Sequence, residues 1–80
     1  MTANAHRNPV TEGALLKRIN RRLRHENEVM KVERSWSSDF GWYWIFSWDA
    51  NGPIATNCDP EKVGRELGVL RKDEFMPRPR

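Results

Sequence analysis

Residues 42–48, Trp-Tyr-Trp-Ile-Phe-Ser-Trp, place five aromatic side chains in seven positions. Aromatic residues favour strands, and successive side chains of a strand alternate between the two faces of a sheet. The two faces are Trp42, Trp44, Phe46 and Trp48 on one side, and Tyr43, Ile45 and Ser47 on the other. Because both carry apolar residues, the pattern predicts a central strand. We expect the tryptophan-bearing face to be buried, since a small domain needs large side chains to fill its core.

The flanking segments show two further strands and two helices. Residues 29–36 alternate between apolar and polar side chains, which predicts a half-buried strand, and residues 54–58 predict a third strand after the turn 49–52. Leucine and isoleucine recur at helical spacing over residues 12–25, after the N-cap candidate Thr11. A second, shorter helix begins at Asp59-Pro60 and ends at Gly68.

The element order α-β-β-β-α predicts an α+β fold. Three consecutive strands joined by short loops should form an antiparallel meander, with both helices packed on one of its faces. Eighty residues suffice for one domain, and we expect it to span residues 11–71. Residues 1–10 and the charged tail 72–80 are predicted to be flexible. The predicted open face of the sheet carries Lys31, Glu33, Tyr43, Ile45, Ala55 and Asn57.

Positive charge is concentrated in the first part of the chain. Residues 1–25 hold six basic side chains and one acidic one, for a charge of +5, whereas the remaining residues hold eight basic and ten acidic ones, for −2. At about 100° per residue, the basic side chains of the first helix lie opposite or beside its apolar stripe. They are Lys17, Arg18, Arg21, Arg22 and Arg24. This distribution indicates an anionic partner.

Two explanations of the basic helix remain open. The first is a nucleic-acid-binding surface, in which the basic side chains contact phosphates and Tyr43 or Trp36 stacks on bases. The second is a solvated helix face whose charges pair with Glu26, Glu28 or the second helix. An anionic membrane surface is disfavoured, because the apolar face of this helix is needed for the core.

Catalytic and metal-binding patterns are weak. The only cysteine, Cys58, precedes a helix start but lies on the strand face of Ile54 and Thr56, which favours a small buried side chain. His6 and His25 lack ligand-spaced neighbours. We therefore predict a non-enzymatic protein with neither cofactor nor metal. One cysteine and the absence of a long apolar run favour the cytoplasm and no membrane span.

Two resemblances accompany this pattern. The element order is similar to that of the double-stranded-RNA-binding domain, but Ser37-Ser38-Asp39-Phe40-Gly41 and residues 60–65 stand where that family has its binding motifs. The runs 16–23, 42–46 and 65–70 resemble a small uncharacterised bacterial family, which implies no activity. Element order alone does not carry function.

The sequence thus leads to two functional hypotheses. The first is a small binding module that engages DNA or RNA through its basic first helix, reading shape and charge. The alternative is a protein-interaction module, such as an adaptor, an inhibitor or a homodimer, that uses the open sheet face.

Overall fold

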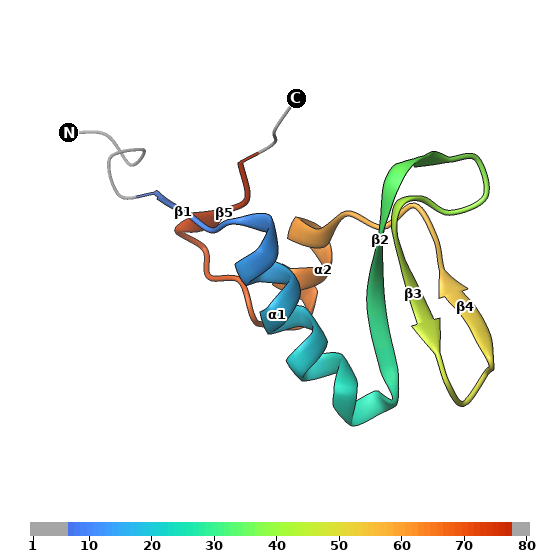
Figure 1. The fold of residues 1–80 in the computed structure, drawn as a ribbon. Helices are drawn as coiled ribbons and strands as arrows, with labels where there is room; N and C mark the ends of the chain where they lie inside the picture. Colours follow the sequence, from blue (N-terminus) through green and yellow to red (C-terminus); the bar gives the residue numbers. More distant parts are fainter. Residues whose placement is uncertain (1–6, 78–80) are drawn as a thin grey trace.

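A computed structural model describes residues 7–77 of the chain, and it confirms the α+β class (Figure 1). The three-stranded antiparallel sheet has the order β2-β3-β4, and a two-stranded parallel sheet pairs β1 with β5. In chain order the elements are β1 (Asn8–Pro9), α1 (Glu12–Leu23), the 3₁₀ turn η2 (Arg24–Glu26), β2 (Glu28–Ser37), β3 (Gly41–Ser47), β4 (Gly52–Ala55), α2 (Pro60–Glu66) and β5 (Glu74–Phe75).

Both helices begin at side-chain caps that the sequence predicted. Thr11 Oγ1 accepts a hydrogen bond from the backbone N–H of Ala14 at 3.1 Å, and Asp59 caps α2 by accepting from the N–H of Glu61 at 3.0 Å. Each cap satisfies a backbone donor that has no partner within its helix. The chain leaves α1 through η2 and turns into β2 at Asn27, whose φ is +61°.

The register of the sheet decides which side chains share a face. Met30 lies opposite Ile45, and Lys31 lies opposite Trp44. Directly opposed residues in an antiparallel pair point to the same side, so Met30 and Ile45 share one face while Lys31 and Trp44 share the other. The β2–β3 pairing is interrupted between Val32 and Ser37, and the β3–β4 pairing shifts register between Ile45 and Phe46.

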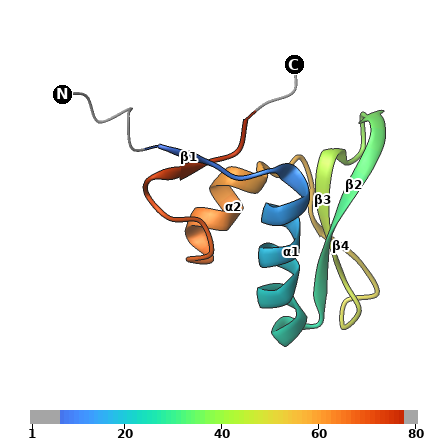
Figure 2. The same ribbon diagram turned by 60° about the vertical axis from the view of Figure 1, so that its left-hand side comes forward.

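The core lies between α1 and the Met30/Ile45 face of the sheet. The apolar stripe of α1, Leu15, Ile19 and Leu23, is buried together with these two residues. Both helices lie on this side of the sheet (Figures 1 and 2). The Asn20 side chain also ties α1 to β2, because its Oδ1 accepts from the N–H of Met30 at 2.7 Å.

The prediction that the tryptophan-bearing face is buried was wrong. Tyr43, Ile45 and Ala55 pack on the helix side, whereas Trp44 and Phe46 lie on the other side with Lys31 and Glu33. The alternation along β3 was predicted correctly, but each set of side chains was assigned to the wrong side of the sheet. The predicted open face combined Lys31 with Tyr43, whereas the observed register pairs Lys31 with Trp44, an offset of one residue. Such an offset exchanges the two faces of a strand completely.

The second helix approaches α1 closely at Gly64. A Cβ at this position would lie 3.0 Å from Leu15 Cδ1 and 3.2 Å from Leu70 Cβ. The glycine therefore permits close packing of α2 against α1 and the segment that follows α2.

The fold extends beyond the predicted limits of residues 11–71. β1 pairs with β5 in parallel, and Val10 and Met76 are both buried in the core, Met76 with 3% exposure. The Arg7 guanidinium lies 4.3 Å from the centre of the Phe75 ring. Residues 8–10 and 74–76 are thus integral to the domain, while residues 1–6 and 78–80 of the predicted flexible ends lie outside the described part.

Candidate nucleic-acid interface

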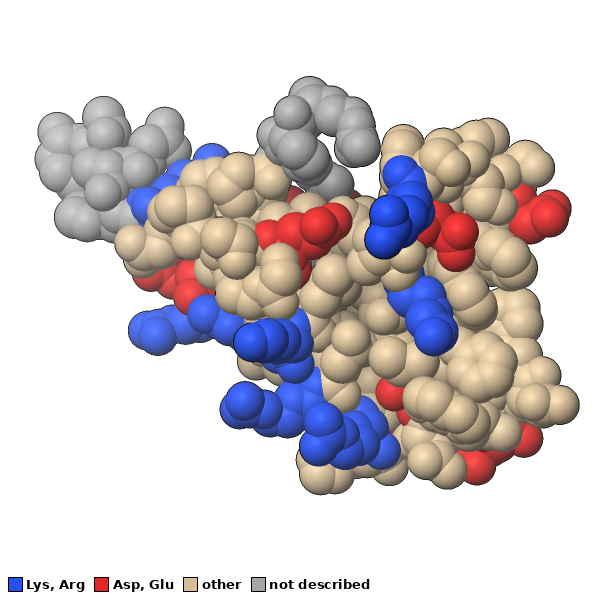
Figure 3. All heavy atoms as spheres, viewed as in Figure 1, with Lys and Arg blue, Asp and Glu red and all other residues tan. Residues whose placement is uncertain are grey.

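Three cations form a line along the solvent side of α1 and the first residue of η2. Lys17, Arg21 and Arg24 are exposed, and helical periodicity places them together, opposite the buried stripe. We call these three residues the basic row. Arg22 is also exposed, but helical periodicity places it beside the buried stripe, about 100° around the helix from Arg21. Among residues 7–77 none of these four cations takes part in an ion pair, and Figure 3 shows Lys and Arg side chains gathered over α1.

Arg18 has a different role from its four basic neighbours. Its guanidinium donates to both carboxylate oxygens of Glu74, at 2.8 and 3.2 Å, and to the carbonyl oxygen of Val69 at 3.1 Å. From the sequence, Arg18 was a phosphate-binding candidate. In the structure it holds β5 and the segment after α2 against α1. It does pair with an acid, but that acid is Glu74 of β5 and not Glu26, Glu28 or an acid of the second helix, which were the predicted partners.

The predicted stacking residues occupy different environments. Tyr43 packs against the core on the helix side of the sheet, and its hydroxyl donates a hydrogen bond to Glu12 Oε2. The expectation that Tyr43 lies on the open face was therefore wrong. Trp36 is 58% exposed, as expected, but it belongs to the irregular part of β2 and does not line the hollows that are described below.

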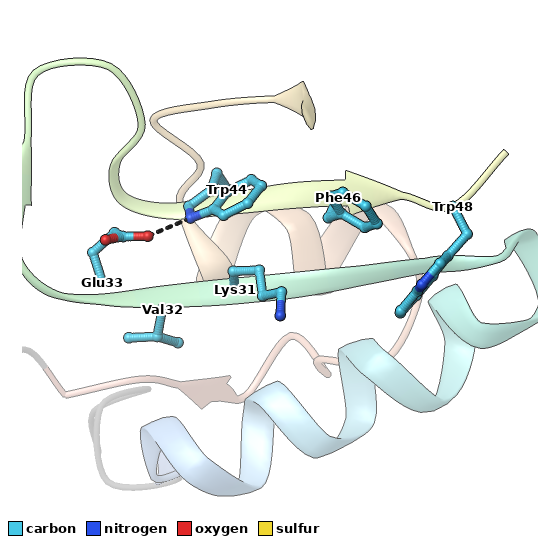
Figure 4. Close-up of a pocket in the computed structure, with 6 residues that line it drawn as sticks. All are labelled: Lys31, Val32, Glu33, Trp44, Phe46 and Trp48. Atoms are coloured by element: carbon cyan, nitrogen blue, oxygen red, sulfur yellow. Dashed lines mark hydrogen bonds between the residues drawn. The ribbon is translucent and has the colours of Figure 1, made fainter. Parts of the chain in front are cut away.

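The open face of the sheet carries aromatic side chains that the sequence pattern predicted to be buried. Trp44, Phe46 and Trp48, which we call the aromatic row, follow one another along β3 and the residue after it (Figure 4). They line a shallow hollow of about 520 Å³ together with Lys31, Val32 and Glu33. The alternation in the sequence defined this set of residues, but only the register shows which side of the sheet it occupies.

A smaller hollow joins the aromatic row to the basic row. Its volume is about 150 Å³, and both Arg24 and Trp48 line it. The two rows come together because η2 leads the chain from α1 directly into β2. The backbone N–H of Trp48 donates a hydrogen bond to Asn27 O at 3.0 Å, which holds Trp48 at this corner. The basic side of α1 and the open side of the sheet therefore meet at Arg24 and Trp48.

Cys58 lies in another groove, between α2 and the sheet. The groove has a volume of about 580 Å³, and Cys58, Ile45 and Val63 are among its lining residues. Burial raises the pKa of the Cys58 thiol, which disfavours the reactive thiolate. Within residues 7–77, no cluster of three or more potential metal-ligating side chains occurs, and no helix is sufficiently long and apolar to cross a membrane.

Comparisons with protein-family models, with curated proteins and with solved structures give no match. The resemblances drawn from the sequence therefore stay predictions.

Proposed function

We propose that this protein is a non-enzymatic nucleic-acid-binding module that contacts phosphates through α1. The observation that supports the proposal is a group of exposed cations on α1 and on the η2 turn that follows it. These are Lys17, Arg21, Arg22 and Arg24, which have no ion-pair partner among residues 7–77. Lys17 and Arg21 repel each other one helical turn apart, which costs stability. A polyanion would remove this repulsion, and each neutralised phosphate would release counterions. The single cysteine favours a reducing compartment, and we infer a cytoplasmic location.

The alternative of a protein-interaction module requires a different surface from the one that the sequence indicated. It relied on Tyr43 and Ile45, and both pack on the helix side of the sheet. A protein partner or a second copy would have to bind the aromatic row instead. Binding to such a row depends mainly on apolar contact and is much less sensitive to salt than binding to phosphates.

The test is fluorescence anisotropy with labelled single-stranded and duplex DNA and RNA at several salt concentrations. Four phosphate contacts predict an affinity that falls about 50-fold for a single strand and about 150-fold for a duplex between roughly 50 and 200 mM salt. The double variant Lys17→Ala/Arg21→Ala should make the slope of log affinity against log salt shallower by about 1.5 to 2. Its fold should persist, because alanine favours helix and the substitution removes like-charge repulsion.

A matched control removes the same charge elsewhere. Lys62 and Lys72 are also exposed but lie on α2 and near β5, so Lys62→Ala/Lys72→Ala should leave the salt slope close to that of the unmodified protein. Absence of binding at low salt, or equal effects of the two double variants, would contradict the proposal.

A further inference from the structure

The aromatic row presents ring surface to solvent in a fixed arrangement. Trp44 stacks on Phe40 with ring centres 4.5 Å apart, and its indole N–H donates to Glu33 Oε2 at 2.7 Å. Phe46 meets Trp44 and Trp48 edge to face, with centre distances of 6.3 and 5.3 Å. The Trp48 side chain is nevertheless 57% exposed. Because these contacts already restrict the aromatic side chains, the protein would lose little side-chain entropy when a planar ligand stacks on them.

Cations lie at two points beside the aromatic row. Lys31 is exposed and lines the larger hollow, where Figure 4 shows its side chain beside the row. Arg24 shares the smaller hollow with Trp48 and continues the basic row of α1. Glu28 also lines the smaller hollow, and its carboxylate would repel a phosphate inside it. A base therefore suits the position over Trp48, with its phosphate on the side of Arg24.

We propose that the nucleic acid is single-stranded, with bases stacked on the aromatic row and the backbone phosphates directed towards the basic row. This inference rests on the proposed function and specifies its substrate class. A duplex covers the flat faces of its bases, whereas a single strand presents them to aromatic side chains. The basic row alone would suit either form. Its connection through Arg24 to Trp48 is the feature that favours a single strand.

A second copy of the chain is the competing occupant of the aromatic row. Two copies related by a two-fold axis through this face would present the same patch to each other. The hollow carries both Lys31 and Glu33, so its own charges favour neither occupant. The cations that continue from Arg24 onto α1 have no ion-pair partner among residues 7–77, and they complement a polyanion.

The experiment compares binding of a labelled oligothymidylate of about 12 nucleotides, within the range of known single-strand site sizes, with binding of a duplex of equal length. We expect the single strand to bind at least about tenfold more tightly. Trp48→Ala should weaken single-strand binding about tenfold or more and leave the salt slope unchanged, because it removes stacking and no charge. Trp48→Tyr keeps a flat ring and should retain most of the affinity.

Trp36→Ala is the matched control, because its indole is as exposed as that of Trp48 but does not line either hollow. It should bind as the unmodified protein does, and the melting temperature verifies that each variant folds. Salt-dependent binding without single-strand preference, or equal effects of the two alanine variants, would overturn this inference and leave the proposed function intact. Absence of salt-dependent binding would overturn both. Sedimentation as a dimer that Trp48→Ala dissociates would assign the aromatic row to a second copy.

Discussion

Glu74 connects three parts of the molecule through a single carboxylate. It accepts two hydrogen bonds from Arg18 on α1 and one from the backbone N–H of Arg71 at 2.9 Å. The Arg18 hydrogen bonds, with a further contribution from Arg71, lower the pKa of Glu74 below its ordinary value. The folded protein therefore binds a proton at this carboxylate less readily than the unfolded chain does.

This difference predicts how stability depends on pH. A carboxylate with a lowered pKa contributes stability above its unfolded pKa, and the contribution is lost as the pH falls through the folded pKa. We expect the melting temperature to fall on acidification below the ordinary carboxyl value of 4.5, and to fall less steeply in Glu74→Gln. The measurement is thermal unfolding between about pH 7 and pH 3.

Glu66→Gln provides the control for this pH series. Glu66 is exposed on α2 and has no ion pair among residues 7–77. Its variant should follow the unmodified protein as the pH falls. If Glu74→Gln and Glu66→Gln both gave curves parallel to that of the unmodified protein, the stabilising role of the Arg18–Glu74 contact would be refuted.

The packing of α2 against α1 depends on the missing side chain of Gly64. A methyl group there would meet Leu15 and Leu70 at distances that force both to shift. Overpacking of a core costs about 1–3 kcal/mol, and the gain in helix propensity from glycine to alanine is about 1 kcal/mol. We expect Gly64→Ala to lower the free energy of unfolding by about 1 kcal/mol, and the melting temperature by about 5 °C.

Gly13 offers a direct comparison on the other helix. A Cβ at Gly13 would have nothing within 4 Å, so Gly13→Ala should raise the free energy of unfolding by up to about 1 kcal/mol. Chemical denaturation measures both variants. A Gly64→Ala protein more stable than the unmodified one would show that Leu15 and Leu70 shift to accept the methyl group, and it would contradict the overpacking predicted here.

The elements could be predicted from the sequence because their causes are local. Thr11 and Asp59 cap helices through hydrogen bonds to residues two or three positions away. The buried face of β3 could not be predicted in this way. It depends on Ile45 lying opposite Met30, a pairing between residues far apart in the chain. The same holds for the candidate site. The basic row could be predicted from the helical period, whereas the exposure of Trp48 depends on the register of the strands.

At the level of the whole molecule, the two ends of the described chain close the fold. β1 and β5 pair through residues that are 66 positions apart in the chain, and this pairing brings Val10 and Met76 into the core. The composition around residues 72–80, charged and rich in proline, gave no sign of this role. The Arg18–Glu74 pair completes the closure from the side of α1.

A pair of truncations tests this closure. A chain that ends at Arg71 loses β5, Met76 and the partner of Arg18, and we expect it to lose at least about 3 kcal/mol of stability, since truncation of one buried methionine costs about 2–5 kcal/mol. A chain that ends at Pro77 keeps all of the contacts named above and should unfold at the same denaturant concentration as the full chain. Equal stability of the two truncated chains would show that β5 contributes nothing.

The charge distribution of the whole chain points to the same surface as its geometry. The chain carries +5 in its first 25 residues and −2 in the rest, and the positive part meets the aromatic row at one corner of the fold. A ligand that has both negative charge and flat aromatic groups would contact both features at once. Single-stranded nucleic acid has this combination.

The most direct test is nuclear magnetic resonance of the ¹⁵N-labelled protein titrated with the unlabelled oligothymidylate. We expect the backbone signals of Lys17, Arg21 and Arg24 to shift together with the indole N–H signal of Trp48, while the indole signal of Trp36 stays in place. Shifts confined to the groove beside α2, or no shifts at low salt, would contradict a nucleic-acid interface on α1 and the open face of the sheet.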